Sequence, residues 1–145
     1  MLMPDVNVLV YAHRSDETVH LPYKRWLTDV VNGREPFALS VLVAVGFVRV
    51  VTNPKMYRVP TPLPTAIAVV DQLVVHPRCR LVLPSSGHWR HVAELCRSTN
   101  AHGKLVADAQ HAAIAIDEGC TWVTRDGDFE AFAPQGLRWQ HLTLS

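Results

Sequence analysis

The first twelve residues form an apolar run that contains one acid, Asp5, and one amide, Asn7. A run of this kind is typical of an interior strand or a buried helix. An ionised carboxylate that is buried without a partner costs several kcal/mol or more. Asp5 therefore either caps a turn where the run reaches the surface or faces a cation. The rest of the chain has to discriminate between these two interpretations.

Short apolar runs alternate with helical patterns along the rest of the chain. Strands are predicted near residues 1–5, 36–39, 80–83, 121–124 and 137–142, and helices near 6–13, 23–31, 41–51, 65–76, 85–96 and 105–118. The prolines between Lys55 and Pro64 predict a loop. Strands separated by helices favour one α/β domain over residues 1–145, with a mainly parallel sheet of about five strands.

Composition excludes some classes of protein and leaves others open. An apolar share of 48% and a net charge of +1 describe an ordinary globular protein, and a nucleic-acid binder is not indicated by overall charge. The three cysteines are odd in number and show no Cys-x-x-Cys spacing, which favours reduced thiols over a disulfide framework or a zinc site. No basic segment precedes the first apolar run, and the run is too short to span a membrane. These features predict a cytoplasmic protein that has no membrane partner.

Carboxylates follow two of the predicted strands. Asp5 ends the first strand, Asp126 and Asp128 follow the fourth, and Asp108 lies one turn into the helix before the fourth. The carboxyl ends of parallel strands meet at one edge of a sheet, so these four acids are expected at the same rim. Their repulsion would raise their pKa values unless a cation neutralised them. Oxygen ligands suit Mg²⁺, with Mn²⁺ as a substitute, and such a cation can orient water and stabilise charge on a phosphodiester.

Each acid also has a structural interpretation. Asp5 alone suits a turn or a helix cap. Asp108 near a helix start could complement the helix dipole, and Asp126-Gly127-Asp128 is a common turn composition. Only their joint position at one rim favours a metal-dependent phosphodiesterase site.

Three short motifs contain these acids: Asp5-Val6-Asn7-Val8-Leu9, Leu105-Val106-Ala107-Asp108-Ala109 and Thr124-Arg125-Asp126-Gly127-Asp128-Phe129. Their order and spacing resemble those of PIN-domain ribonucleases, and in particular those of the VapC toxins of bacterial toxin–antitoxin pairs. The resemblance covers essentially the whole chain. It implies a three-layer α/β/α fold and a magnesium-dependent endoribonuclease that cleaves structured RNA, such as transfer or ribosomal RNA. It also implies a homodimer that a cognate antitoxin holds inactive.

The resemblance also implies roles for individual residues. Asp5 and Asp108 would be the principal metal ligands and catalytic residues. Asp126 would complete the catalytic cluster, and Asp128 would support it as a further metal ligand. The supporting residues Asn7 and Thr124 would hydrogen-bond to the carboxylates and orient them.

Basic residues flank the predicted rim or its loops. They are Arg14, Arg49, Lys55, Arg58 and Arg125. Positive charge around an acidic metal centre is what an RNA backbone needs, so these residues are candidates for RNA binding. As scattered residues they also suit a solvated surface. The apolar helix at 41–51 suits a dimer or antitoxin interface as well as ordinary core burial.

One departure from the PIN pattern keeps other functions open. PIN nucleases usually carry another acid, commonly glutamate, on the helix at 41–51, where this chain has Gly46 or a neighbour of it. The loss favours, as an alternative, a catalytically weakened RNA-binding or regulatory module. A third class, phosphatases and receiver domains, needs a second acid in Asp5-Val6-Asn7 or a lysine after a late strand, and the chain has neither.

Overall fold

A five-stranded parallel sheet forms the centre of the computed structural model, which describes all 145 residues. The strand order is β3-β2-β1-β4-β5. The strands are β1 (Leu2–Pro4), β2 (Phe37–Ser40), β3 (Cys79–Val82), β4 (Thr121–Thr124) and β5 (Trp139–His141). The helices are α1 (Val6–His13), α2 (His20–Asn32), α3 (Val41–Val51), α4 (Leu63–Val74), α5 (His88–Thr99), α6 (Lys104–Glu118) and the 3₁₀ helix η1 (Gly127–Gln135).

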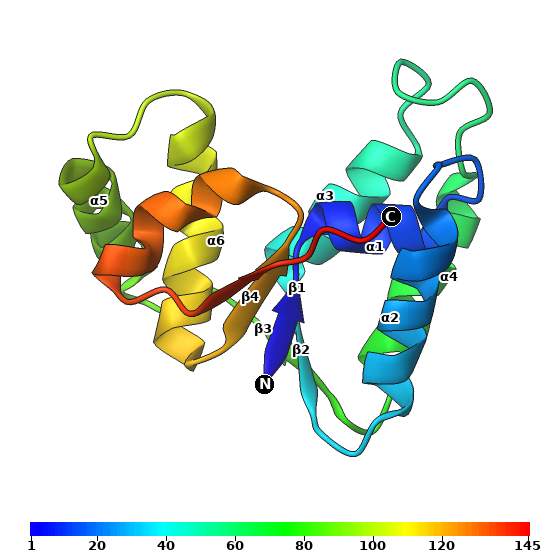
Figure 1. Cartoon of the computed structure of the whole chain (residues 1–145), viewed down its shortest axis with the longest axis horizontal. Helices are drawn as coiled ribbons and strands as arrows, with labels where there is room; N and C mark the ends of the chain where they lie inside the picture. Colours follow the sequence, from blue (N-terminus) through cyan, green and yellow to red (C-terminus); the bar gives the residue numbers. More distant parts are fainter.

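Helices cover the sheet in two separate groups. Figure 1 shows α1 to α4 on one side of the sheet and α5, α6 and η1 on the other. Within each group the helices pack against one another, as α1 does on α2 and α3 and as α5 does on α6. The predicted three-layer α/β/α class is therefore confirmed. None of the helices has both the length and the apolar composition of a transmembrane segment.

The direction in which strands are added reverses beside the central strand β1. From β1 the chain adds β2 and then β3 on one side, and then returns to add β4 and β5 on the other. Pro4 of β1 is in register with Val123 of β4, and the amide of Asp5 donates to the carbonyl of Val123 at 2.8 Å. Ligands of parallel α/β sheets collect at such a reversal, outside the carboxyl ends of the strands. Asp5 and Thr124 both lie there.

Side-chain caps mark the starts of α1, α3 and η1, at Asp5, Ser40 and Asp126. The bounds of α3 are those predicted, and Ser40 caps the helix by accepting from the amide of Leu42 at 3.3 Å. The predicted loop is too long by two residues, because α4 begins at Leu63 and has Pro64 in its first turn. A proline is tolerated in the first turn, because the backbone N–H that it lacks would have had no acceptor within the helix. The helix η1 was not predicted.

The inner face of α6 is lined by small residues that let it pack closely on the sheet. Ala109, Ala112 and Ala113 are fully buried. Asp108 begins this buried face at its end nearest the carboxyl ends of the strands, and it is only 7% exposed. Helical periodicity therefore directs the Asp108 carboxylate inward, toward the edge of the sheet where Asp5 lies.

Candidate active site

Asp5 is both a helix cap and a member of a buried polar cluster. Its carboxylate is 7% exposed and accepts from the amide of Val6 at 2.6 Å, at the start of α1. Its other oxygen accepts from the hydroxyl of Thr124 at 2.6 Å. Burial raises the pKa of Asp5 to about 6, although these two hydrogen bonds act to lower it, and the nearby charges of Asp108 and Asp126 raise it further. The cap interpretation of Asp5 is confirmed, whereas its role in holding a cation stays a prediction.

Thr124 and Asn7 connect Asp5 to the segment that follows β4. The Thr124 hydroxyl, which is fully buried, accepts from the amide of Asp126 at 3.0 Å. The Asn7 side chain donates to Asp5 and to Thr124, each at 3.4 Å, and accepts from the amide of Arg125 at 3.2 Å. These bonds fix the position of the β4–η1 connection relative to the Asp5 carboxylate.

Asp126 caps η1 with one carboxylate oxygen and directs the other toward a lysine. Its Oδ1 accepts from the amide of Asp128 at 2.9 Å, and its Oδ2 accepts from the ammonium group of Lys104. Partial burial acts to raise the pKa of Asp126, but the hydrogen bonds from Lys104 and Asp128 outweigh it and the pKa is lowered. The turn interpretation is therefore confirmed for Oδ1, whereas Oδ2 is left free of the turn and faces Lys104.

Lys104 is the residue of the site that the motifs did not reveal. Its Nζ donates to Oδ2 of Asp108 at 2.8 Å and lies 3.8 Å from Oδ2 of Asp128. The predicted helix begins at residue 105 and leaves Lys104 out, whereas α6 begins at Lys104 and places it one turn before Asp108. Burial raises the pKa of Asp108, and Lys104 opposes this only in part. Asp108 lies beyond the first turn of α6, so the helix-dipole interpretation does not account for it.

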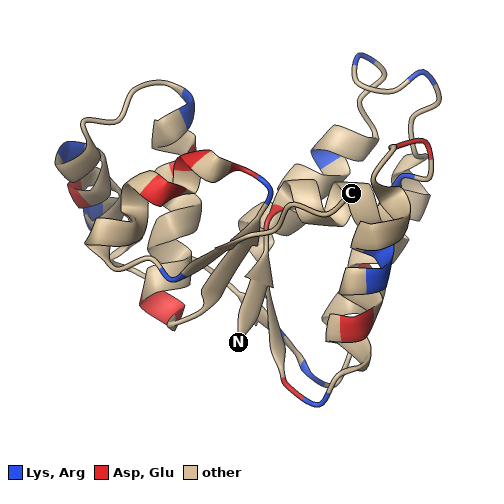
Figure 2. Ribbon diagram, in the orientation of Figure 1, with Lys and Arg blue, Asp and Glu red and all other residues tan.

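The acids of the site have the chemistry of a magnesium site. Figure 2 shows acidic and basic residues side by side where the chain leaves β4 and enters η1. Oxygens of Asp108, Asp126 and Asp128 point to one cation, the Lys104 ammonium. In their present positions no three His, Cys, Asp or Glu side chains form a group that could hold a metal ion. Carboxylate oxygens are the donors that Mg²⁺ prefers, so the chemistry of these side chains fits that ion.

The guanidinium of Arg14, one of the candidates for RNA binding, forms its hydrogen bonds with other residues of the protein. Its Nε and Nη2 donate to Asp16 at 2.9 and 2.6 Å, and its Nη1 donates to the carbonyl of Val59 at 2.9 Å and to Thr61 at 3.2 Å. The guanidinium also stacks 4.0 Å above the ring of Tyr57. Arg14 therefore holds the loop after α3 against α1, and we assign it a structural role.

The other basic candidates lie in three different parts of the fold. Arg125 directly precedes Asp126, lies 5.1 Å from the ring of Tyr11, and forms no ion pair. Lys55 and Arg58 are exposed in the loop before α4, and Arg49 borders a groove between α3 and α4. Only Arg125 is adjacent to the carboxylates in sequence.

The position of the expected helix acid is closed by a neighbouring side chain. Gly46 of α3 packs against α1, and a β-carbon at position 46 would lie 2.8 Å from Cγ2 of Val6. Val6 directly follows Asp5 in the sequence. Since a β-branched side chain in a helix has little rotamer freedom, a larger residue at position 46 would force Val6 or the two helices to shift.

We expect Gly46→Ala to lower the free energy of unfolding by about 1 kcal/mol. Overpacking costs about 1–3 kcal/mol, which exceeds the gain of about 1 kcal/mol in helix propensity. In a Val6→Ala background the same substitution should instead be neutral or stabilising, because the clashing methyl group is gone. Urea unfolding of the four proteins in a double-mutant cycle measures this coupling. An equal effect in both backgrounds would contradict it.

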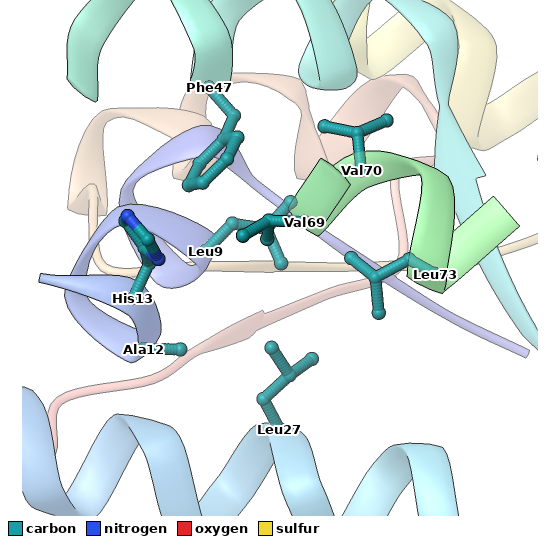
Figure 3. A pocket seen from close by; sticks show the side chains of 8 residues that line it. All are labelled: Leu9, Ala12, His13, Leu27, Phe47, Val69, Val70 and Leu73. Atoms are coloured by element: carbon teal, nitrogen blue, oxygen red, sulfur yellow. The ribbon is translucent and has the colours of Figure 1, made fainter. Parts of the chain in front are cut away.

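A separate apolar pocket of about 120 Å³ lies between α1, α2, α3 and α4. Seven of the eight residues that line it are hydrophobic; the lining is Leu9, Ala12, His13, Leu27, Phe47, Val69, Val70 and Leu73. Figure 3 shows these side chains pointing from all four helices into the same space. A second, outer groove of about 400 Å³ lies between α3 and α4, where Val45 and Ile67 are exposed.

Comparison with known proteins identifies the family. The model of the PIN domain family matches residues 2–134. Ribonuclease VapC43 of Mycobacterium tuberculosis is 40% identical over 141 residues, which cover 97% of this chain and 95% of VapC43. Ribonuclease VapC31 of the same organism is 34% identical over 133 residues, which cover 92% of this chain and 94% of VapC31.

Solved structures agree on the fold. The toxin VapC20 of Mycobacterium tuberculosis, which cleaves the sarcin–ricin loop, matches with a TM-score of 0.69 at 16% identity, over 98% of each chain. The VapBC2 complex of Rickettsia felis, bound to promoter DNA, matches with a TM-score of 0.68 at 19% identity, also over 98% of each chain. With the motifs, the fold and the relatives in agreement, the chain belongs to the PIN-domain family and, within that family, to the VapC proteins.

Proposed function

We propose that this protein is a magnesium-dependent endoribonuclease that cleaves structured RNA, such as transfer or ribosomal RNA, and acts as the toxin of a toxin–antitoxin pair. The observation that carries the proposal is the group of four acids, Asp5, Asp108, Asp126 and Asp128, at the strand reversal of a PIN-domain chain. We choose RNA as the phosphodiester substrate because relatives at 40% and 34% identity are named ribonucleases.

The four acids of the proposed site would hold the metal ion, and two polar neighbours orient one of them. Asp108, Asp126 and Asp128 would hold a magnesium ion, and Asp5 would complete the shell. When bound, such an ion supplies charge stabilisation on the phosphodiester and lowers the pKa of a bound water. Thr124 and Asn7 hold the Asp5 carboxylate in one orientation before substrate arrives, so no free energy is spent on ordering it during the reaction.

Arg125 is the residue best placed to bind the RNA backbone beside this centre. Its guanidinium forms no ion pair, and the rings of Tyr11 and Tyr23 lie 5.1 and 5.7 Å from it. These aromatic contacts hold the guanidinium against α1 and α2 without neutralising its charge, one residue before Asp126 in the sequence. Lys55 and Arg58 in the exposed loop would extend the contact along the backbone.

Incubation of the purified protein with end-labelled transfer and ribosomal RNA tests the proposed activity. We expect discrete cleavage products in Mg²⁺ or Mn²⁺ and intact RNA in EDTA, because the acids alone cannot neutralise charge on the phosphodiester. Cleavage that persists in EDTA would contradict the metal dependence. Ends mapped on the products would identify the RNA and the cleaved bond.

Gly46 supports one alternative function. Because the acid expected on α3 is absent and Val6 fills the adjacent space, the centre has one ligand fewer than PIN nucleases usually carry. A catalytically weakened RNA-binding or regulatory module would retain RNA in a gel-shift assay in Mg²⁺ but leave it intact. The same reaction mixture, analysed on native and denaturing gels, distinguishes this alternative from the nuclease.

The antitoxin is proposed to bind the apolar face of α3 and α4. The structures similar to this chain include VapBC complexes of toxin and antitoxin. Val45 is 64% exposed and Ile67 is 45% exposed along the outer groove, where an apolar segment of a partner would remove both from water. Adding the purified cognate antitoxin to the RNA reaction should suppress cleavage. A homodimer that forms together with this complex would need an apolar surface outside the groove.

A further inference from the structure

We propose that Lys104 is a built-in competitor of the divalent cation, whose ammonium group occupies the metal position in the metal-free protein and has to leave before the ion binds. The inference rests on the proposed metal dependence and goes beyond it. It states that the ammonium group of Lys104 lowers the affinity of the site for the metal ion.

The geometry around Nζ is that of a cation in a carboxylate site. Lys104 donates to Asp108 and to Asp126, and Asp128 lies 3.8 Å away. The two donated bonds come from one atom to acids on different elements, α6 and the β4–η1 connection. One ammonium therefore links the two segments that a metal ion would link.

The position of Lys104 in its helix shows that the carboxylates hold it there. It is the first residue of α6, where the partial positive charge of the helix terminus disfavours a cation. The preceding Gly103 provides no side-chain cap, and the first turn contains no acid. Local helix energetics therefore do not favour a lysine at this position, whereas the acids of the site do.

The lysine side chain is free to leave. It is 62% exposed, whereas the side chain of Asp108 is 11% exposed. Its ion pairs are therefore partly screened by water and individually weak, so a divalent ion with more charge can replace them. After displacement, the long flexible side chain can extend into solvent, and the carboxylates that it held apart can close on the ion.

Metal titration tests the proposal without any measurement of cleavage. We expect Mn²⁺, titrated calorimetrically, to bind Lys104→Met about tenfold more tightly than the wild type, which corresponds to about 1.4 kcal/mol. Lys104→Arg keeps the charge and should bind Mn²⁺ no more tightly than the wild type does. Lys24→Met, on the exposed face of α2, removes the same charge away from the site and should have no effect.

A second measurement separates displacement from a general effect of charge. Acetylation of Lys104, followed by peptide mass spectrometry, should become faster when Mg²⁺ is added, while acetylation of Lys24 in the same sample should not change. Equal Mn²⁺ affinity in Lys104→Met and wild type, weaker binding in the variant, or an unchanged acetylation rate would each overturn the proposal. Loss of RNA cleavage with normal Mn²⁺ binding would overturn the proposed function alone.

Discussion

Asp5→Asn and Asp108→Asn are each expected to lower the rate of RNA cleavage by at least about a hundredfold, because residues that only support metal ligands already contribute about 10- to 100-fold. Both substitutions keep the shape of the side chain and remove a charge that the cation needs. Asparagine at position 5 also remains a good helix cap, so the start of α1 is preserved. Initial rates on labelled transfer and ribosomal RNA in excess Mg²⁺ measure the effect.

Asp117→Asn is a suitable control, because Asp117 lies on the same helix as Asp108 and pairs with His91 of α5 at 2.9 Å. It should cleave at the wild-type rate. If cleavage persisted unchanged in Asp5→Asn or Asp108→Asn, the activity would come from a contaminant or from another site. A melting temperature that falls sharply in Asp108→Asn would instead assign this residue a structural role.

Asp5→Asn should also stabilise the metal-free protein, and the gain should grow with pH. The folded state raises the pKa of Asp5 to about 6, so the folded protein holds this proton more tightly than the unfolded chain does. Below the unfolded pKa both states are protonated and no cost exists. As the pH rises through the folded pKa, ionising the buried carboxylate comes to cost roughly 3 kcal/mol. Asparagine avoids this cost.

Urea unfolding in EDTA at several pH values checks the expectation. The stability difference between Asp5→Asn and wild type should increase by about 2 kcal/mol between pH 4.5 and 7.5. Because both proteins share every other titrating group, the difference isolates Asp5. Excess Mg²⁺ should reduce this difference at pH 7.5, since a bound cation offsets the buried charge. A difference that does not change with pH would show that Asp5 is not the group that burial affects.

The edge at which the acids meet was predictable from the sequence, because strand ends and helix periodicity are local signals. Asp5 and Asp126 each follow a short apolar run, and Asp108 shares a helical face with Ala112. Parallel winding then places them together without any knowledge of distances. The bounds of α3 and β4 were also predicted from local signals. Ser40 caps the start of α3, and Gly119 ends α6 just before β4.

Features that depend on contacts between distant segments were not predictable. The role of Arg14 depends on a loop that returns to it 45 residues later, at Val59. The two oxygens of Asp126 serve different partners, and no sequence pattern distinguishes one oxygen from the other. The close approach of Gly46 to Val6 follows from how α3 crosses α1. The sequence showed that an acid was missing but not that its space was filled.

The bond between Asp5 and Thr124 joins residues that are 119 positions apart, and this has a consequence for the order of events during synthesis. Asp5 leaves the ribosome among the first residues, but its partners Thr124 and Asp126 are translated only after more than four fifths of the chain. At about 5–20 residues per second, several seconds separate them. An incomplete chain that ends before β4 contains Asp5 and Asp108 but lacks the hydroxyl that orients Asp5 and the carboxylates of Asp126 and Asp128. The proposed site is therefore completed only when the last fifth of the chain has been translated.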